Sequence, residues 1–140
     1  MNTTITREDN AAIADMEVVG NGLDAFNLAQ AGEYEYTPLR LFARDENGAI
    51  AGGLLADVYF RWAFVKILWV DERLRGRGLG VELMRRAEAE ARELGCTGIW
   101  LDTFSFQAPE FYRKLGYDEF GRLDDYPPGF SRHFFRKMLA

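Results

Sequence analysis

The sequence is poor in the residues from which disulfide frameworks and metal sites are built. Its 140 residues include one cysteine, Cys96, and one histidine, His133. A single cysteine excludes a disulfide within the chain, and neither residue has a partner at the spacing of zinc ligands. We therefore expect no disulfide framework and no metal.

Long apolar runs and an excess of positive charge are also missing. No stretch approaches the roughly 18 apolar residues of a membrane span, and the N-terminus is polar. Lys and Arg number 17 against 22 Asp and Glu, which gives a net charge of -5. Nucleic-acid binders carry the opposite balance, because they contact phosphates. The sequence thus argues against membrane and nucleic-acid partners. With no signal-like N-terminus, it predicts a cytoplasmic protein.

What is present is an ordinary globular composition. Hydrophobic residues make up 48% of the chain and charged residues 28%, which argues against disorder of the whole chain. No repeat, low-complexity segment or linker divides the sequence, and 140 residues suit one domain. We predict a single domain over residues 1–140.

The middle of the chain has the pattern of an antiparallel meander. Thr37–Arg44 is strand-like, and Asn47-Gly48 tolerates the positive φ angles of a tight hairpin. Ile50–Tyr59 then predicts the returning strand, and Ala63–Val70 a third strand. The N-terminal third is harder to interpret: it suggests a short strand at residues 3–6, and one or two helical turns at residues 18–31, broken by two glycines.

After Gly80, the spacing between apolar residues changes from two positions to three or four. The positions that recur on one face are Leu79, Leu83, Ala87, Ala91 and Leu94. The other face is charged, with Glu82→Arg86 and Glu88→Arg92 in the favourable i,i+4 order. Gly95 ends this predicted helix.

The apolar segment Gly98–Thr103 follows the helix and predicts a strand parallel to Ala63–Val70, since a strand, a helix and a strand in succession imply a crossover. A short helix from Pro109 to Leu115 and strands at Tyr117–Leu123 and His133–Met138 complete the chain. The expected fold is α/β (α+β): a mixed, mostly antiparallel twisted sheet with helices on both faces. Ala63–Val70 should splay from Gly98–Thr103 at one end.

The loop Arg73–Gly80, with sequence RLRGRGLG, stands between a strand and a helix. Its three alternating glycines let the backbone approach a ligand. The free N–H groups at the start of the helix, together with the helix dipole, favour an anion. The arginines at positions 73, 75 and 77 add charge for a phosphate. The alternative is a tight turn with solvated arginines.

Two well-known phosphate loops do not fit this segment. A triphosphate loop needs GxxxxGK followed by Ser or Thr, and no such pair is present. A dinucleotide fingerprint needs GxGxxG at the start of a parallel sheet, whereas the spacing here is GxGxG after a meander.

The segment does resemble the acetyl-CoA signature of the GNAT superfamily of N-acetyltransferases. In that signature, Gln or Arg is followed by any two residues and Gly, and then by any one residue and Gly or Ala. It matches at Arg73/Gly76/Gly78 and again at Arg75/Gly78/Gly80. In a second family element, Ala is followed four residues later by Tyr, and this Tyr four residues later by Gly and an aromatic residue. Ala108, Tyr112, Gly116 and Tyr117 match it. Ser105 stands where the family often has Asn.

The resemblance covers residues 37–138 and implies acetyl-CoA (coenzyme A) as cofactor, N-acetyltransferase activity and direct acetyl transfer to an amine. It implies a cofactor-binding set: Leu68, Trp69, Val70, Arg73, Arg75, Gly76, Arg77, Gly78, Leu79, Gly80, Ser105, Ala108 and Tyr112. It also implies Tyr112 as proton donor to the departing thiolate, although on periodicity alone Tyr112 is equally a core aromatic. The backbone N–H of Val70 is the corresponding candidate for polarising the thioester carbonyl.

The base and the acceptor pocket are less marked. Ala63–Val70 has no acid, although some family members carry a glutamate in this strand. Asp102, at the end of the next predicted strand, is our candidate base, the alternative being a carboxylate that caps a strand end. Aromatic residues at predicted loops or strand ends are candidates for the acceptor pocket: Phe60, Trp62 and Tyr126.

Three readings of the function remain. The first is an acetyltransferase for a primary amine of a small molecule or peptide, and Tyr112 favours it. The second is a non-catalytic acyl-CoA-binding domain, and the third is a protein or peptide acetyltransferase. The family also implies a homodimer through sheet edges or the last strands. The sequence does not name the acceptor.

Overall fold

The computed structural model describes all residues, 1–140, as two compact units, Met1–Tyr34 and Glu35–Ala140. In the first unit, residues 1–8 have no regular structure, so the predicted strand at residues 3–6 is wrong. Helix α1 runs without a break over Ile13–Ala31. The prediction that Gly20 and Gly22 interrupt it is also wrong: glycine costs a helix about 1 kcal/mol but leaves its hydrogen bonds intact.

No residue of α1 is buried, and its apolar side chains lie on several sides of the helix. Gly32 follows α1 with a φ of 81°, and its N–H donates to the carbonyl of Leu28. None of the helices is both long enough and apolar enough to cross a membrane.

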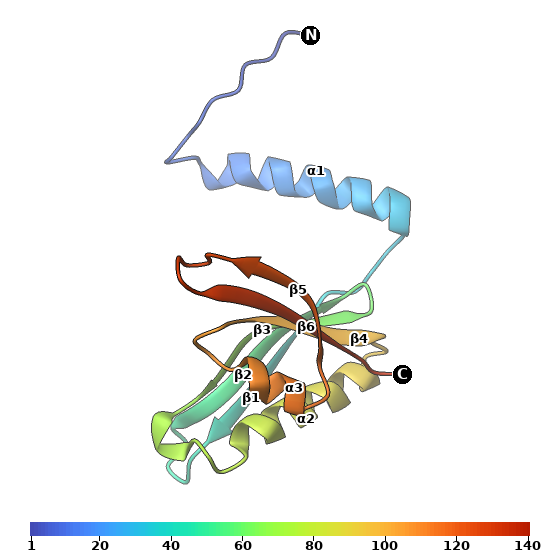
Figure 1. Cartoon of the computed structure of the whole chain (residues 1–140). Helices are drawn as coiled ribbons and strands as arrows, with labels where there is room; N and C mark the ends of the chain where they lie inside the picture. The colour runs from blue at the N-terminus through green and yellow to red at the C-terminus, as the bar shows by residue number, and fades with distance from the viewer. The chain divides into compact units, whose positions relative to one another are not determined.

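The second unit is built on a six-stranded sheet in the order β1-β2-β3-β4-β6-β5 (Figure 1). The strands are β1 Thr37–Arg44, β2 Ile50–Tyr59, β3 Trp62–Val70, β4 Gly98–Phe104, β5 Asp118–Asp124 and β6 Ser131–Met138. A short 3-10 turn at Glu72–Leu74, helix α2 over Leu79–Glu93 and helix α3 over Pro109–Lys114 complete it. The predicted strands and both later helices are confirmed to within two residues.

Antiparallel hairpins build most of the sheet, as the turn signals predicted. β1 pairs with β2 and β2 with β3, and Gly48 adopts a φ of 81° in the first turn. β6 pairs antiparallel with both β4 and β5. The single parallel pair is β3 with β4, which α2 connects. The mixed, mostly antiparallel fold class is therefore confirmed.

The parallel pair is short, and this opens the sheet. β3 and β4 pair only from Trp62–Gly98 to Val65–Leu101. Beyond Val65 the second half of β3 has β2 on one side and no strand on the other. The splay that we predicted between these strands is thus confirmed. It leaves backbone groups at the end of β3 free to meet a ligand.

Both α2 and α3 pack on one face of the sheet (Figure 1). Alternate strand residues such as Leu54, Ile99 and Phe135 meet Met84 of α2 and Tyr112 of α3 in one core. Between Glu35 and Ala140, no helix covers the opposite face.

Glu88 is the main difference from the predicted charge pattern of α2. We predicted an exposed Glu88–Arg92 pair, but the Glu88 side chain is 2% exposed. Its carboxylate accepts hydrogen bonds from Lys137 Nζ at 3.0 Å and from the Tyr117 hydroxyl at 2.8 Å. A buried carboxylate is tolerated only with such partners, and both come from outside the helix, where sequence periodicity could not find them.

Candidate active site

A cleft of about 930 Å³ lies where β3 and β4 separate. The end of β3, the loop after it, the start of α2, the end of β4 and α3 form its walls. This volume is in the range of sites for small molecules and cofactors. Leu68, which packs against the core, and Trp69, the next residue of β3, both line the cleft, so side chains from both faces of this strand contribute to it.

The glycines of the loop form one end of the cleft. Gly76 and Gly78 have φ angles of 78° and 80°, a left-handed conformation that strongly favours glycine. Gly78 is also the residue that precedes α2, and nothing lies within 4 Å of the point where a Cβ would stand on either residue. The first N–H groups of α2 therefore border open space, as an anion site requires.

The three arginines of the loop have different surroundings. Arg75 lines the cleft, and its Nε donates a hydrogen bond of 3.1 Å to the carbonyl of Val70. Arg73 is paired with Asp71 at 3.0 Å, which holds the pKa of that carboxyl below its usual range. Neither Arg73 nor Arg77 lines the cleft. Of the three, Arg75 is the one placed to meet a phosphate.

Tyr112 reaches the cleft from α3. Its side chain is 8% exposed and packs edge-on against Phe111, with ring centroids 5.1 Å apart. Burial, with a smaller contribution from the negative charge of Asp102, raises the pKa of Tyr112 to about 12. The phenol is therefore protonated at neutral pH.

Asp102 lines the same cleft from β4 and is held by an arginine that the sequence did not single out. Arg132 of β6 donates from Nε and Nη2 to Oδ1 of Asp102, both at 2.8 Å. It also donates from Nη1 to the Tyr126 hydroxyl at 3.0 Å. The contact with Asp102 raises the pKa of Arg132. Two predicted residues, Asp102 and Tyr126, are thus brought together through Arg132.

The chain matches the model of a known protein family. Residues 10–117 match the model of the acetyltransferase (GNAT) family. The chain belongs to the GNAT acetyltransferase family. The matched range includes α1, the glycine loop and Tyr112.

Individual GNAT relatives agree with this assignment. The chain is 46% identical over 109 residues to a blasticidin-S acetyltransferase from Streptomyces morookaense, a match over 75% of this chain and 80% of that protein. The crystal structure of an acetyltransferase from Bacillus cereus ATCC 14579 has a TM-score of 0.86 and 38% identity, covering 96% of this chain and 98% of that one.

A further solved structure shares the fold. A structure described as a putative streptothricin acetyltransferase from Bacillus anthracis was solved in complex with acetyl coenzyme A. It has 22% identity and a TM-score of 0.65, covering 74% of this chain and 63% of that chain. The GNAT family uses acetyl-CoA.

Most of the predicted cofactor residues line the cleft: Leu68, Trp69, Val70, Arg75, Gly76, Gly78, Leu79, Gly80, Ala108 and Tyr112. Ser105 does not. Its hydroxyl accepts from the backbone N–H of Ser131 at 3.0 Å and so joins the loop after β4 to β6. The role of each residue in binding acetyl-CoA stays a prediction.

None of the predicted acceptor residues Phe60, Trp62 and Tyr126 lines the cleft, and two of them lie far along β3 from it. Phe60 is in the turn between β2 and β3, and Trp62 begins β3 opposite Gly98. The cleft is at the other end of β3, and neither residue lines it. Trp62 instead packs so closely on Gly98 that a Cβ there would come within 2.5 Å of its ring.

An aromatic cluster stands beside the cleft and contains Tyr126, a predicted acceptor residue, together with three phenylalanines. Phe106 lines the cleft. Its ring stacks on that of Phe104, with centroids 5.3 Å apart, and meets the ring of Phe130 edge-on, with centroids 5.1 Å apart. Tyr126 contacts Phe104 at 5.6 Å. These rings come from the loops after β4 and β5, which the β4–β6 pairing brings together. The run FSF was the only sequence signal for Phe104 and Phe106.

His133, the single histidine, is buried beneath this region. Its Nε2 is 2.7 Å from the Ser131 hydroxyl, and its Nδ1 contacts Glu119. It does not line the cleft. No group of three or more His, Cys, Asp or Glu side chains in the chain could hold a metal ion.

Proposed function

We propose that this GNAT acetyltransferase moves an acetyl group from acetyl-CoA directly to a primary amine of a small molecule. The observation that carries the proposal is the cleft at the β3–β4 splay, in which Tyr112 and Asp102 face one space. A binding domain without chemistry has no need of a buried phenol and a carboxylate at that point.

The loop and the start of α2 would hold the cofactor. Gly76, Gly78 and the first turn of α2 supply backbone N–H groups, and Arg75 supplies a charge. Acetyl-CoA brings the acetyl group as an activated thioester. The N–H of Val70, at the end of β3, is our candidate for polarising the thioester carbonyl.

Tyr112 is proposed to stabilise and protonate the departing thiolate. Its pKa of about 12 lies above the roughly 8.5 of an ordinary thiol, so complete proton transfer is uphill. The hydroxyl acts first as a hydrogen-bond donor to the sulfur, and the proton follows as charge develops. We therefore expect an effect at the low end of the range for a general acid.

Asp102 is proposed to receive the amine. A primary amine is a cation at neutral pH and must lose a proton before it attacks. Oδ1 of Asp102 accepts hydrogen bonds from Arg132, whereas Oδ2 has no hydrogen bond within the protein. Oδ2 is therefore our candidate for accepting the proton of the amine. Phe106, which lines the cleft, offers a ring face that attracts a cation.

A small-molecule acceptor is supported by the relative that is named for blasticidin S. The test is thiol release from acetyl-CoA with a panel of amines: blasticidin S, aminoglycosides, polyamines, amino acids and a lysine peptide. Turnover with a small amine supports the proposal. Acetyl-CoA binding without turnover on any amine would favour the binding domain, and turnover on the peptide alone would favour the peptide acetyltransferase.

The residue test is Tyr112→Phe, measured in a single turnover with the best amine. The acetylation rate should fall by about 100-fold, while acetyl-CoA affinity stays unchanged. Tyr117→Phe is the matched control. Its ring lies 6.1 Å from Tyr112, but its hydroxyl bonds to Glu88 in the core, so it should lose stability and keep its rate. An unchanged rate in Tyr112→Phe would leave Tyr112 as packing.

A further inference from the structure

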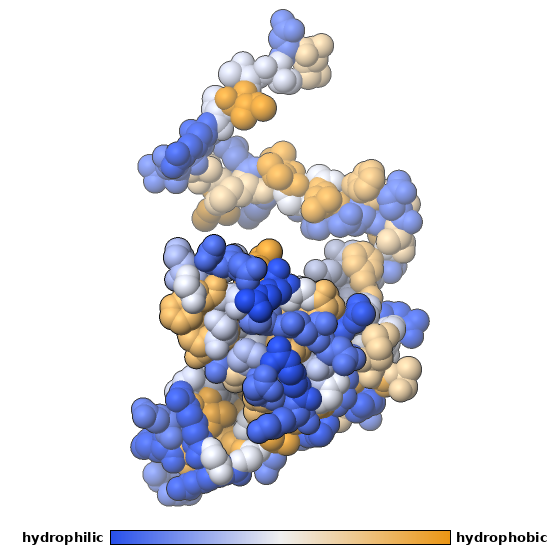
Figure 2. All heavy atoms as spheres, viewed as in Figure 1, coloured by the Kyte–Doolittle hydropathy of each residue, from blue (hydrophilic) through white to orange (hydrophobic).

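Helix α1 exposes a large amount of apolar surface. Seven large apolar side chains in it are 49–76% exposed: Ile13, Met16, Val18, Val19, Leu23, Phe26 and Leu28. In Figure 2, orange spheres are spread along the helix. Isolated helices are marginal in water, and α1 also contains Gly20 and Gly22. The helix therefore needs a surface to pack against.

These apolar residues lie on more than one side of the helix. Met16, Val19, Leu23 and Phe26 follow at i, i+3, i+7 and i+10 and form one stripe, which we call the α1 stripe. Val18 and Leu28 lie outside it. A helix that is apolar on several sides is normally buried on several sides, so one covering surface is not enough for α1.

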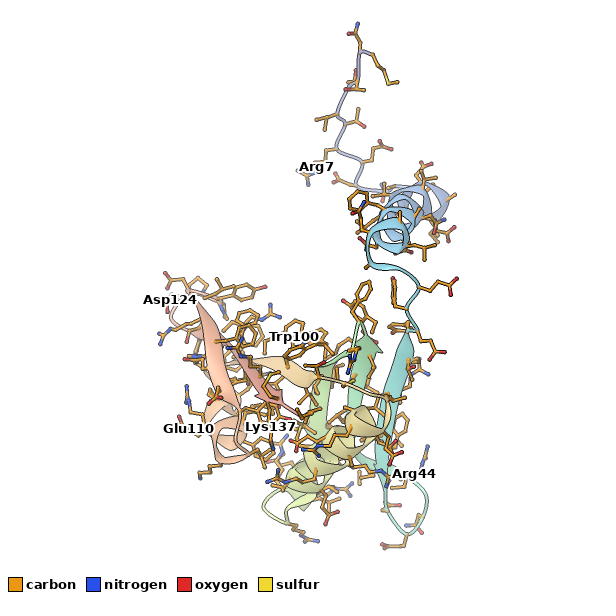
Figure 3. The ribbon with its side chains drawn as sticks, turned by 90° about the vertical axis from the view of Figure 1, so that its right-hand side faces the viewer. Arg7, Arg44, Trp100, Glu110, Asp124 and Lys137 are labelled. Carbon is orange, nitrogen blue, oxygen red and sulfur yellow. The ribbon has the colours of Figure 1, made fainter.

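One face of the sheet is correspondingly bare. Its residues alternate with those of the core, and cross-strand partners mark two rows, Arg40–Leu55–Ile67 and Phe64–Trp100–Arg136. Phe64 and Trp100 stack at 4.1 Å, and Trp100 lies on the side of the sheet opposite α2 (Figure 3). We call this the bare sheet face. No helix of the unit from Glu35 to Ala140 covers it.

The bare sheet face is also hollowed. Phe42, Leu55 and Ile67 contribute to an apolar depression of about 150 Å³. Phe42 and Ile67 are 53% and 52% exposed. Large apolar patches of this kind on a folded unit mark interaction sites.

The charges of the two surfaces are complementary. From residue 8 to residue 39 the chain has seven acidic residues and no Lys or Arg: Glu8, Asp9, Asp15, Glu17, Asp24, Glu33 and Glu35. On the bare sheet face, Arg40 and Arg136 are cationic and form no salt bridge within the chain. The same face also carries Asp57, which is paired with Lys66, and Asp118, the cross-strand partner of Arg136. The acidic helix is thus complementary to the two arginines rather than to the face as a whole.

We propose that α1 of one copy docks on the bare sheet face of a second copy, which makes a two-fold dimer by reciprocal exchange. The α1 stripe meets the sheet, and the two α1 helices cover each other's remaining apolar residues near the axis. Packing of α1 on its own sheet would leave Val18 and Leu28 without a second surface. The dimer supplies both surfaces.

The first test is the mass of the full chain by sedimentation velocity and light scattering. The parent should be a dimer of twice 16.0 kDa. Leu23→Asp combined with Phe26→Asp should raise the dimer dissociation constant by at least roughly 100-fold, from the lost burial of two large side chains. A monomeric parent overturns the proposal.

The second test separates exchange between copies from packing within one copy. Phe42→Asp places a charge on the bare sheet face and should also give monomers. Mixed in equal amounts, the helix variant and the sheet variant should form a heterodimer, because one intact α1 can still meet one intact sheet. A mixture that remains monomeric, while both variants bind acetyl-CoA and are therefore folded, overturns exchange.

Discussion

Gly78→Ala separates the cofactor role of the glycine loop from its role in the fold. Gly78 precedes α2 with a φ of 80° and a ψ of 5°, and it lines the cleft. Alanine in this left-handed region costs roughly 1–2 kcal/mol in stability. The added Cβ meets no protein atom within 4 Å, so the fold suffers only this strain.

The chain contains a matched control at the other end of the same helix. Gly95 follows α2 with a φ of 79°, also with nothing within 4 Å of the Cβ position, but it does not line the cleft. Gly95→Ala should therefore lose a similar amount of stability. Only Gly78→Ala places a methyl group where the phosphates of acetyl-CoA are proposed to approach the backbone.

Two measurements on each variant decide the matter. Thermal unfolding should show comparable falls of a few degrees. Calorimetric titration with acetyl-CoA should show at least roughly a tenfold loss of affinity, about 1.4 kcal/mol, for Gly78→Ala and no loss for Gly95→Ala. Equal affinities in the two variants would refute the phosphate role of the loop, because strain alone would then explain both.

Two further predictions concern the cleft. Because burial raises the pKa of Tyr112 to about 12 from 10.0 in the unfolded chain, its contribution to stability is complete below pH 10 and is lost as the pH rises through 12. By pH 11 the lost stability amounts to about 1.4 kcal/mol. The free energy of unfolding, measured in urea, should therefore fall less steeply between pH 9 and pH 11 for Tyr112→Phe than for the parent. Parallel curves would contradict the raised pKa. Asp102→Asn cannot accept a proton, so kcat/KM for the amine should fall at least roughly tenfold near neutral pH with unchanged acetyl-CoA affinity. The deficit should shrink toward pH 10, where the amine loses its proton unaided, and a deficit that is constant with pH would assign Asp102 to positioning.

The sequence by itself determined the fold class and the loop. Asn47-Gly48, the change of period after Gly80 and the alternating glycines are local signals, because hairpin, helix and left-handed turn each depend on neighbouring residues. The strand and helix bounds that followed from them agree with the structure from Thr37 to Met138. The N-terminal helix was misjudged because helix propensity gave Gly20 and Gly22 too much influence: a glycine weakens a helix but leaves its backbone hydrogen bonds intact.

Only the tertiary structure decided which distant side chains meet. Arg132 reaches Asp102 because β6 lies beside β4, and Lys137 and Tyr117 reach the buried Glu88 from other elements. It likewise placed Phe106 beside the cleft and Trp62 at the far end of β3. These contacts depend on strand order and register, which join residues 20 or more positions apart, so no local pattern specifies them.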